Sequence, residues 1–158
     1  MEPPRSDPVG EYWASFIRAG SAPAHAATAR YQAWSFGNTP DMADRLGELV
    51  RRGAKTATAT LVWSLEAANE PYPVVREYSI ILDGHGLPMC IIQTTALSVV
   101  PFDEVDEEHA YLEGEGDRSL RYWRKAHWSY FGEECRRMGS RPKAQMPILC
   151  ERFVLVHK

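Results

Sequence analysis

A helix that carries signals at both ends runs directly into an alternating segment, and this feature most constrains the fold. Residues 39–41, Thr-Pro-Asp, suit the cap, the first position and the positive dipole end of a helix. Residues 51–53, Arg-Arg-Gly, give it a basic last turn and a left-handed stop. In GAKTATAT, residues 53–60, threonine then alternates with alanine, which is the period of a strand from Thr56 to Thr60. A helix and a strand joined so closely belong to one domain.

Short strand and helix patterns alternate along the rest of the chain. Residues 78–82 and 87–92 flank the turn Asp83-Gly84-His85-Gly86 and predict a hairpin. We expect further strands at 33–36, 94–100 and 147–156, and helices at 11–18, 24–30, 106–112 and 119–138, with a short helical or irregular segment at 61–68. The pattern predicts an α+β fold, a small, mostly antiparallel β-barrel with flanking helices. We expect residues 1–32 to form an N-terminal helical extension packed on the domain, and residues 33–158 to form the domain itself.

Composition sets limits on the class of protein. A chain of 158 residues, 44% hydrophobic and 25% charged, fits one ordinary globular domain. It has no apolar run of the roughly 20 residues that a membrane helix needs, so we expect a cytoplasmic protein without a membrane partner. Cys90, Cys135 and Cys150 lack the spacing of a zinc site and are interpreted as reduced, buried thiols. No obligatory protein partner is evident.

Charge is distributed unevenly along the chain. The formal net charge of −3 argues against nonspecific coating of nucleic acid. Residues 103–117 carry eight acids and no Lys or Arg, whereas residues 118–143 carry eight bases and two acids. This boundary is either a solvated surface or an acidic catalytic edge beside a basic surface that anchors a phosphate-bearing ligand.

Three threonines share one face of the strand at residues 56–60. Thr56, Thr58 and Thr60 point one way, and the small alanines between them allow close packing behind. One interpretation is a polar groove with Lys55 at its rim, since each hydroxyl can donate and accept a hydrogen bond. The alternative is a half-exposed strand with ordinary surface residues.

A glycine-containing acidic turn precedes the long helix. Glu113, Glu115 and Asp117 alternate with glycines there. Crowded carboxylates raise one another's pKa, which suits general acid–base work or a divalent metal, although the pattern is not that of a calcium loop. A capped surface turn explains the same residues.

Aromatic residues could contact a base. Trp123 and His127 share one helical face, where core packing explains most of the pattern. Trp123 could instead stack on a base while Arg124 takes a phosphate, and His127 could shuttle protons. Trp34 and Phe36 leave the same choice open.

The ordered set of these segments resembles the ASCH family, which is related in fold to the PUA RNA-binding domains. The resemblance extends from about Trp34 to Phe153. It is carried by Trp34-Ser35-Phe36-Gly37, Gly53-Ala54-Lys55-Thr56-Ala57-Thr58, the hairpin at 83–86, Glu113-Gly114-Glu115-Gly116-Asp117, Ser119-Leu120, Trp123-Arg124, His127 and Cys150-Glu151-Arg152-Phe153.

The resemblance implies a small PUA-like β-barrel whose cleft lies where the GxKTxT segment meets the acidic turn. Family members are thought to bind RNA; longer ones look like ribonucleases, and short ones are amidohydrolases that deacetylate N4-acetylcytidine. The catalytic residues of the short enzymes correspond to Lys55, Thr58 and Glu113. Those enzymes carry an arginine two residues beyond the threonine, where this sequence has Thr60.

Three functions follow as hypotheses. The first is an RNA-binding hydrolase, a ribonuclease that needs no metal, although Glu115 and Asp117 leave a divalent ion possible. The second is an N4-acetylcytidine-type nucleoside amidohydrolase, and the third is a noncatalytic RNA-binding module. In each case, we expect the ligand, RNA or a modified nucleoside, to contact a common set of residues: Trp34, Phe36, Thr56, Thr60, Glu115, Asp117, Trp123, Arg124 and His127.

Overall fold

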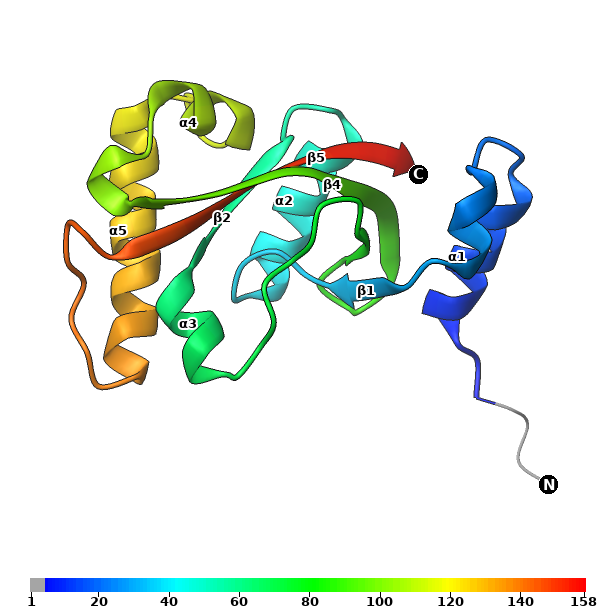
Figure 1. Ribbon diagram of the computed structural model, residues 1–158, viewed down its shortest axis with the longest axis horizontal. Helices are drawn as coiled ribbons and strands as arrows, with labels where there is room; N and C mark the ends of the chain where they lie inside the picture. Colours follow the sequence, from blue (N-terminus) through cyan, green and yellow to red (C-terminus); the bar gives the residue numbers. More distant parts are fainter. Residues whose placement is uncertain (1–4) are drawn as a thin grey trace.

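A curved five-stranded sheet lies between helices that pack at its two ends (Figure 1). The structure is a computed structural model that describes residues 5–158. Within these residues the strands are β1 (Tyr31–Trp34), β2 (Ala57–Leu61), β3 (Tyr78–Leu82), β4 (Pro88–Pro101) and β5 (Pro147–His157). The α-helices are α1 (Pro8–Arg18), α2 (Pro40–Arg51), α3 (Val62–Ala67), α4 (Glu107–Glu113) and α5 (Leu120–Arg137), with 3-10 turns at Ala24–Thr28 and Phe102–Glu104.

The strand order corrects the predicted barrel. The order is β1-β3-β4-β5-β2, so that in the described part of the chain β1 and β2 are edges and the sheet does not close. The sheet is also mixed, because β1 pairs in parallel with β3 while the other pairs are antiparallel. The α+β class is confirmed. Local patterning cannot reveal whether two distant edges meet, which is why closure was predicted wrongly.

Two predicted strands form one long strand. The predicted strands at 87–92 and 94–100 both fall in β4, apart from Leu87, and the pairing of β4 with β5 shifts register at Ile91/Ile92 and at Thr94/Ala96. Such bulges bend a strand and increase its twist without ending it. The long β4–β5 pair therefore runs across the whole domain and connects the two ends of the sheet.

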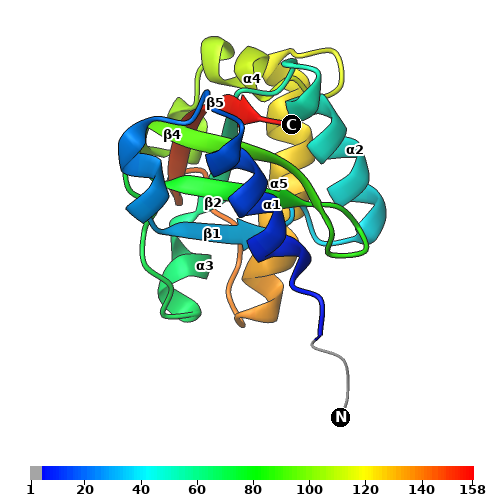
Figure 2. The same cartoon turned by 90° about the vertical axis from the view of Figure 1, so that its right-hand side faces the viewer.

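Each end of the sheet has its own helical cover. Trp13 and Phe16 of α1 pack on Tyr78, Ile80 and Ile91 at one end, and α5 packs at the other (Figures 1 and 2). The first four residues of the expected extension lie outside the described residues. No helix within residues 5–158 is long and apolar enough to cross a membrane.

The signals predicted for α2 are realised in the structure. Thr39 caps the helix by accepting a hydrogen bond from the Met42 amide at 3.2 Å, and Gly53 ends it at φ +77°. The buried face of α2, which includes Leu46 and Val50, packs on Ile81 and Phe153. This packing fixes the direction in which the chain leaves α2, and with it the position of Lys55.

Candidate active site

Backbone contacts hold the Lys55 segment against the acidic turn. The amide of Lys55 donates to the carbonyl of Leu49 at 3.1 Å, and the amide of Thr56 donates to the carbonyl of Leu112 at 2.8 Å. Gly114 has φ +73°, and a Cβ there would lie 2.3 Å from the carbonyl oxygen of Ala54. Only glycine permits this close approach, so two segments nearly sixty residues apart meet at the level of the backbone.

Lys55 is buried in the floor of the site rather than at a rim, which corrects the prediction. Its side chain is 2% exposed. Lys55 Nζ donates to the carbonyl of Ala57 at 2.9 Å, to Glu113 Oε1 at 3.2 Å and to Glu115 Oε2 at 3.1 Å, and lies 5.3 Å from the ring centre of Phe36. Three acceptors and an aromatic face suit an ammonium donor.

Glu113 lies at the centre of a buried polar network. It is 1% exposed, and besides Lys55 it meets His109 Nε2 at 2.9 Å, His127 Nε2 at 3.5 Å and the indole N–H of Trp123. The ring of His127 stacks on Trp123 with centroids 4.2 Å apart and contacts its carbonyl through Nδ1 at 2.9 Å. The carboxylate is therefore fixed in position by partners on both oxygens.

The electrostatics of this network favour a charged Glu113. Burial acts to raise its pKa, but the Lys55 ammonium, the charge of His127 and hydrogen bonds from His109 and His127 hold that pKa well below the usual range. Burial acts to lower the pKa of His127, but the charge of Glu113, the hydrogen bond to it and the charge of Glu115 together outweigh burial and raise that pKa. Glu113 and His127 thus favour each other's charged form.

The three predicted catalytic residues line one cavity. Lys55, Thr58 and Glu113 border a space of about 100 Å³, together with Phe36, Gly37, Met42, Leu46, Ala59, Glu115, Ala126, His127 and Tyr130. We call this space the pocket. Residues from β2, α4 and α5 thus converge on one concave site.

Two larger cavities adjoin the pocket, and we call them together the groove. The first, about 510 Å³, shares Phe36, Thr58 and Tyr130 with the pocket. The second, about 410 Å³, shares Trp34, Thr58 and Thr60 with the first. Thr58 borders all three cavities, so the pocket and the groove form one continuous cleft.

The cleft is acidic. The described residues that line its three cavities include a single lysine, Lys55, and no arginine. His127 is the histidine at the cleft. The carboxyl groups are those of Glu70, Glu77, Glu113, Glu115, Glu134 and Glu151.

The cleft contains some of the predicted ligand-contacting residues and not others. Trp34, Phe36, Thr60, Glu115 and His127 line it. Four others do not line its cavities: Trp123 is buried under His127, Arg124 is exposed and donates to the carbonyl of Asp103, Asp117 is exposed and accepts from the amide of Ser119, and Thr56 lies against Leu112.

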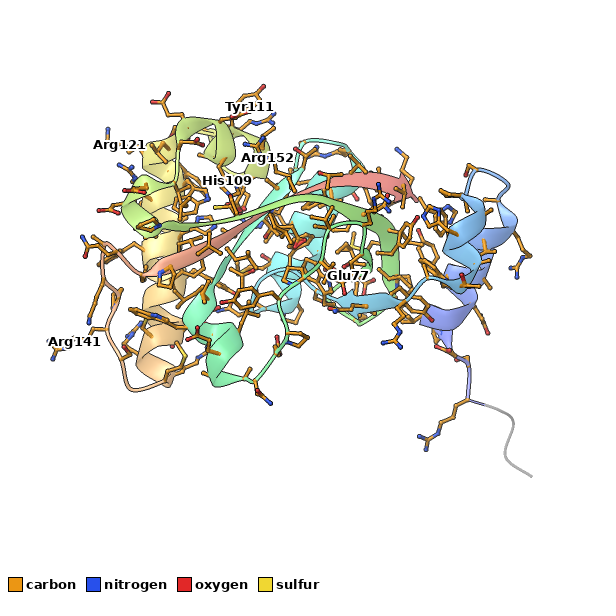
Figure 3. The ribbon with its side chains drawn as sticks, in the orientation of Figure 1. Glu77, His109, Tyr111, Arg121, Arg141 and Arg152 are labelled. Carbon is orange, nitrogen blue, oxygen red and sulfur yellow. The ribbon has the colours of Figure 1, made fainter. Side chains whose placement is uncertain are left out.

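Several residues of the site were not singled out from the sequence. His109 lies four residues before Glu113, and its helical spacing to that carboxylate is the signal that could have revealed it. His109 also lines a separate cavity of about 180 Å³ with Arg152. Tyr130, Glu134 and Glu151 reach the cleft through tertiary structure, for which the sequence carries no local signal. In Figure 3, the side chain of His109, which belongs to α4, lies well apart from that of Glu77.

A divalent ion would find three ligand groups here. Side-chain atoms of Glu113, Glu115 and His127 lie within 4.8 Å of one another. Lys55 already bonds both carboxylates, so its ammonium holds the position that a cation would take. The donor set therefore fits a metal only if Lys55 moves away.

The fold and the site define an α+β domain with a buried lysine–glutamate centre. The family model of the ASCH domain matches residues 32–157, and the chain belongs to this family, whose members generally bind RNA. It is similar to the crystal structure of an ASCH domain from Lactobacillus crispatus, at 28% identity and a TM-score of 0.85, over 94% of this chain and 96% of that one. It is also similar to the crystal structure of an Enterococcus faecalis protein, at 31% identity and a TM-score of 0.83, over 95% of this chain and 88% of that one. No curated protein matches this sequence.

Proposed function

We propose that this protein is an amidohydrolase that removes an acyl group from the exocyclic nitrogen of a nucleoside of the N4-acetylcytidine type. The observation that supports it best is the acidic, arginine-free lining of the cleft that holds Lys55, Thr58 and Glu113. A compact, uncharged amide suits this cleft, whereas carboxylates repel the phosphates of an RNA chain.

Each of the three residues has a role in amide hydrolysis. The Lys55 ammonium faces the carbonyl oxygen and stabilises the negative charge that develops there. It can exchange its contact with Glu115, whose side chain is 20% exposed, for one with that oxygen. The Thr58 hydroxyl orients the attacking water. The Glu113 carboxylate accepts a proton from that water.

The reaction balances without a cofactor. Water adds to the carbonyl carbon and gives one proton to Glu113, forming a tetrahedral oxyanion beside Lys55. The C–N bond then breaks as that proton passes to the leaving nitrogen. The products are a carboxylic acid, which ionises in water, and the free exocyclic amine of the base. His127, 3.5 Å from Glu113 Oε1, holds the carboxylate in its charged form between turnovers.

RNA binding is a second candidate, supported by the family and by a different surface. Exposed bases of α5, among them Arg121, Arg124 and Lys125, lie outside the cleft. Arg121 and Arg141 extend away from the sheet in Figure 3. These side chains could contact phosphates while a modified base enters the cleft. Cleavage of RNA at Lys55 and Glu113, the first hypothesis from the sequence, would require the phosphate itself to enter the acidic cleft.

The test is release of acetate from N4-acetylcytidine by the wild type, Lys55→Ala and Glu113→Gln, followed by chromatography. We expect turnover by the wild type and a loss of at least about 100-fold in both variants. Arg18→Ala, exposed at the end of α1 and outside the cleft, is the control and should keep full activity. A folded wild type that leaves the amide intact but cuts RNA, with cutting lost in Lys55→Ala, would replace the proposal with the ribonuclease.

A further inference from the structure

A row of polar side chains crosses the concave face of the sheet under the groove. Gln32 on β1 pairs with Ser79 on β3, and Thr58 on β2 pairs with Glu151 on β5. Paired residues project to the same face. All four residues line the second cavity of the groove, of about 410 Å³, which we call the far cavity.

Two of these polar groups belong to largely buried residues and keep hydrogen-bonding capacity that the described part of the protein does not fill. Ser79 is 5% exposed, and its hydroxyl makes no hydrogen bond within residues 5–158. Glu151 is 7% exposed, and its Oε2 accepts from Thr94 at 3.1 Å while Oε1 has no protein donor in the described part of the chain. Every fully buried side-chain nitrogen or oxygen among the described residues has a hydrogen-bond partner, so these two unpaired oxygens are open to the cavity rather than enclosed. Both groups line the far cavity, where a ligand can reach them.

The walls of the far cavity add further hydrogen-bond acceptors, which favour a ligand that carries donors. Trp34 supplies an aromatic wall, and Glu70 and Glu77 add carboxylates. Glu77 already accepts from Gln32 at 2.8 Å and from the Val74 amide at 3.2 Å, so it is firmly placed. Carboxylates only accept hydrogen bonds, whereas the hydroxyls of Ser79, Thr58 and Thr60 both donate and accept. A ligand with several neighbouring hydroxyl groups matches this mixture better than a phosphate, which carries acceptors alone.

We propose that the far cavity is a sugar subsite in which Glu151 and Ser79 bind the vicinal diol of a ribose. The assignment of that ribose to a nucleoside rests on the proposed function. The far cavity joins the pocket through Thr58, so a ligand with its ribose against Glu151 directs its base along the groove toward Lys55. One hydroxyl donates to Glu151 Oε1, and the other exchanges hydrogen bonds with Ser79.

Binding of the reaction product tests this subsite without any catalysis. Calorimetric titration of the full chain with cytidine, 2'-deoxycytidine and 2',3'-dideoxycytidine compares ligands that differ only in these hydroxyls. We expect the dideoxy ligand to bind at least about tenfold more weakly than cytidine, the cost of a hydrogen bond to a charged group. Glu151→Gln and Ser79→Ala should weaken cytidine by a similar factor and leave the dideoxy ligand unchanged. Glu133→Gln, on the exposed side of α5, is the matched control.

Three outcomes overturn the subsite. Equal binding of all three ligands to the wild type is the first, and absence of cytidine binding by the folded wild type is the second. The third is displacement of cytidine by 1,4-diaminobutane in the wild type but not in Glu151→Gln, which assigns the far cavity to a cation. Binding that depends on the diol, without amide hydrolysis, would refute the proposed function and leave the subsite standing. Hydrolysis of N4-acetylcytidine and its dideoxy analogue at equal kcat/KM would refute the subsite and leave the proposed function standing.

Discussion

The pocket and the far cavity both contain buried carboxyl groups, but the protein supplies different partners for these groups in the two places. In the pocket, Glu113 and Glu115 each meet Lys55, and Glu113 also meets two histidines and an indole N–H. In the far cavity, Glu151 has one donor among residues 5–158, the hydroxyl of Thr94. The pocket is preorganised by the protein's own charges, whereas the far cavity is completed by the donors of a ligand.

The difference appears in the direction of the pKa shifts. The pKa of Glu113 is held well below its usual range although burial acts to raise it, because Lys55 and the histidines outweigh burial. The pKa of Glu151 is raised by burial, and Glu77 adds to this effect while Thr94 opposes it. The stability that each group contributes should therefore change with pH in opposite directions, because opposite charges compensate Glu113 and not Glu151. Four predictions test this contrast between the pocket and the far cavity.

The largest effect is expected from removing the central cation. Lys55→Met leaves Glu113 buried without its main partner and should cost about 3–5 kcal/mol of unfolding free energy at pH 7. Chemical denaturation measures the loss. In the double variant Lys55→Met/Glu113→Gln, most of the stability should return, because no uncompensated charge remains. A double variant as unstable as Lys55→Met would contradict the description of the pocket as a compensated charge network.

The next effect comes from the turn that closes the pocket. Gly114→Ala adds a Cβ 2.3 Å from the carbonyl oxygen of Ala54 at a positive φ, so we expect a loss of about 2–4 kcal/mol. Gly53→Ala is the matched control, since its φ is +77° but no atom lies within 4 Å of the new Cβ. It should cost only about 1 kcal/mol in the same unfolding experiment. Equal losses in the two variants would show that contact with Ala54 does not matter.

The third effect is a pH dependence of stability centred on the pocket. The raised pKa of His127 contributes stability that is fully present below about pH 6.5 and lost as pH rises through the folded-state pKa. The lowered pKa of Glu113 contributes stability that is present above about pH 4.3 and lost as pH falls. Unfolding measured from pH 3 to pH 9 should show both losses. His127→Gln should remove the alkaline loss, and a variant profile that matches the wild type would refute this role.

The smallest effect is expected from Glu151 in the far cavity, and its contribution to stability should depend on pH in the direction opposite to that of Glu113. Because the pKa of Glu151 is raised, its contribution to stability is present below about pH 4.3 and lost as pH rises through the folded-state pKa. Glu151→Gln should therefore be as stable as the wild type at low pH and slightly more stable at pH 8. Glu133→Gln, which is exposed, should show no such gain. A destabilised Glu151→Gln at pH 8 would mean that the protein itself compensates this charge.

Local signals predicted much of the fold, and long-range pairing explains what they missed. The caps of α2 and the hairpin turn at residues 83–86 act within a few residues, so their elements could be predicted from the sequence. The parallel pairing of β1 with β3 joins residues 31–34 to 78–81, and no local pattern specifies it. The predicted barrel was wrong because closure depends on whether the edge strands β1 and β2 meet, which no local pattern specifies either.

The candidate site shows the same division. The resemblance brought together Lys55, Thr58 and Glu113, and the structure places all three at one cavity. The burial of Lys55 was missed because a lysine next to a polar strand is usually solvated. Here the turn at Gly114 and the ring of Phe36, both distant in sequence from the strand pattern, help to enclose it. Glu151 was missed as a cleft residue because its strand reads as ordinary sheet until the partner strand with Thr58 is known.

Thr58 alone borders every cavity of the cleft, which has a consequence for how this protein can evolve. A substitution there alters at once the room for the reacting bond and the passage for whatever the ligand carries behind it. Divergence to new substrates should therefore begin at positions that border fewer cavities, such as Trp34 and Glu70. Residue 58 should change less, because both demands constrain it.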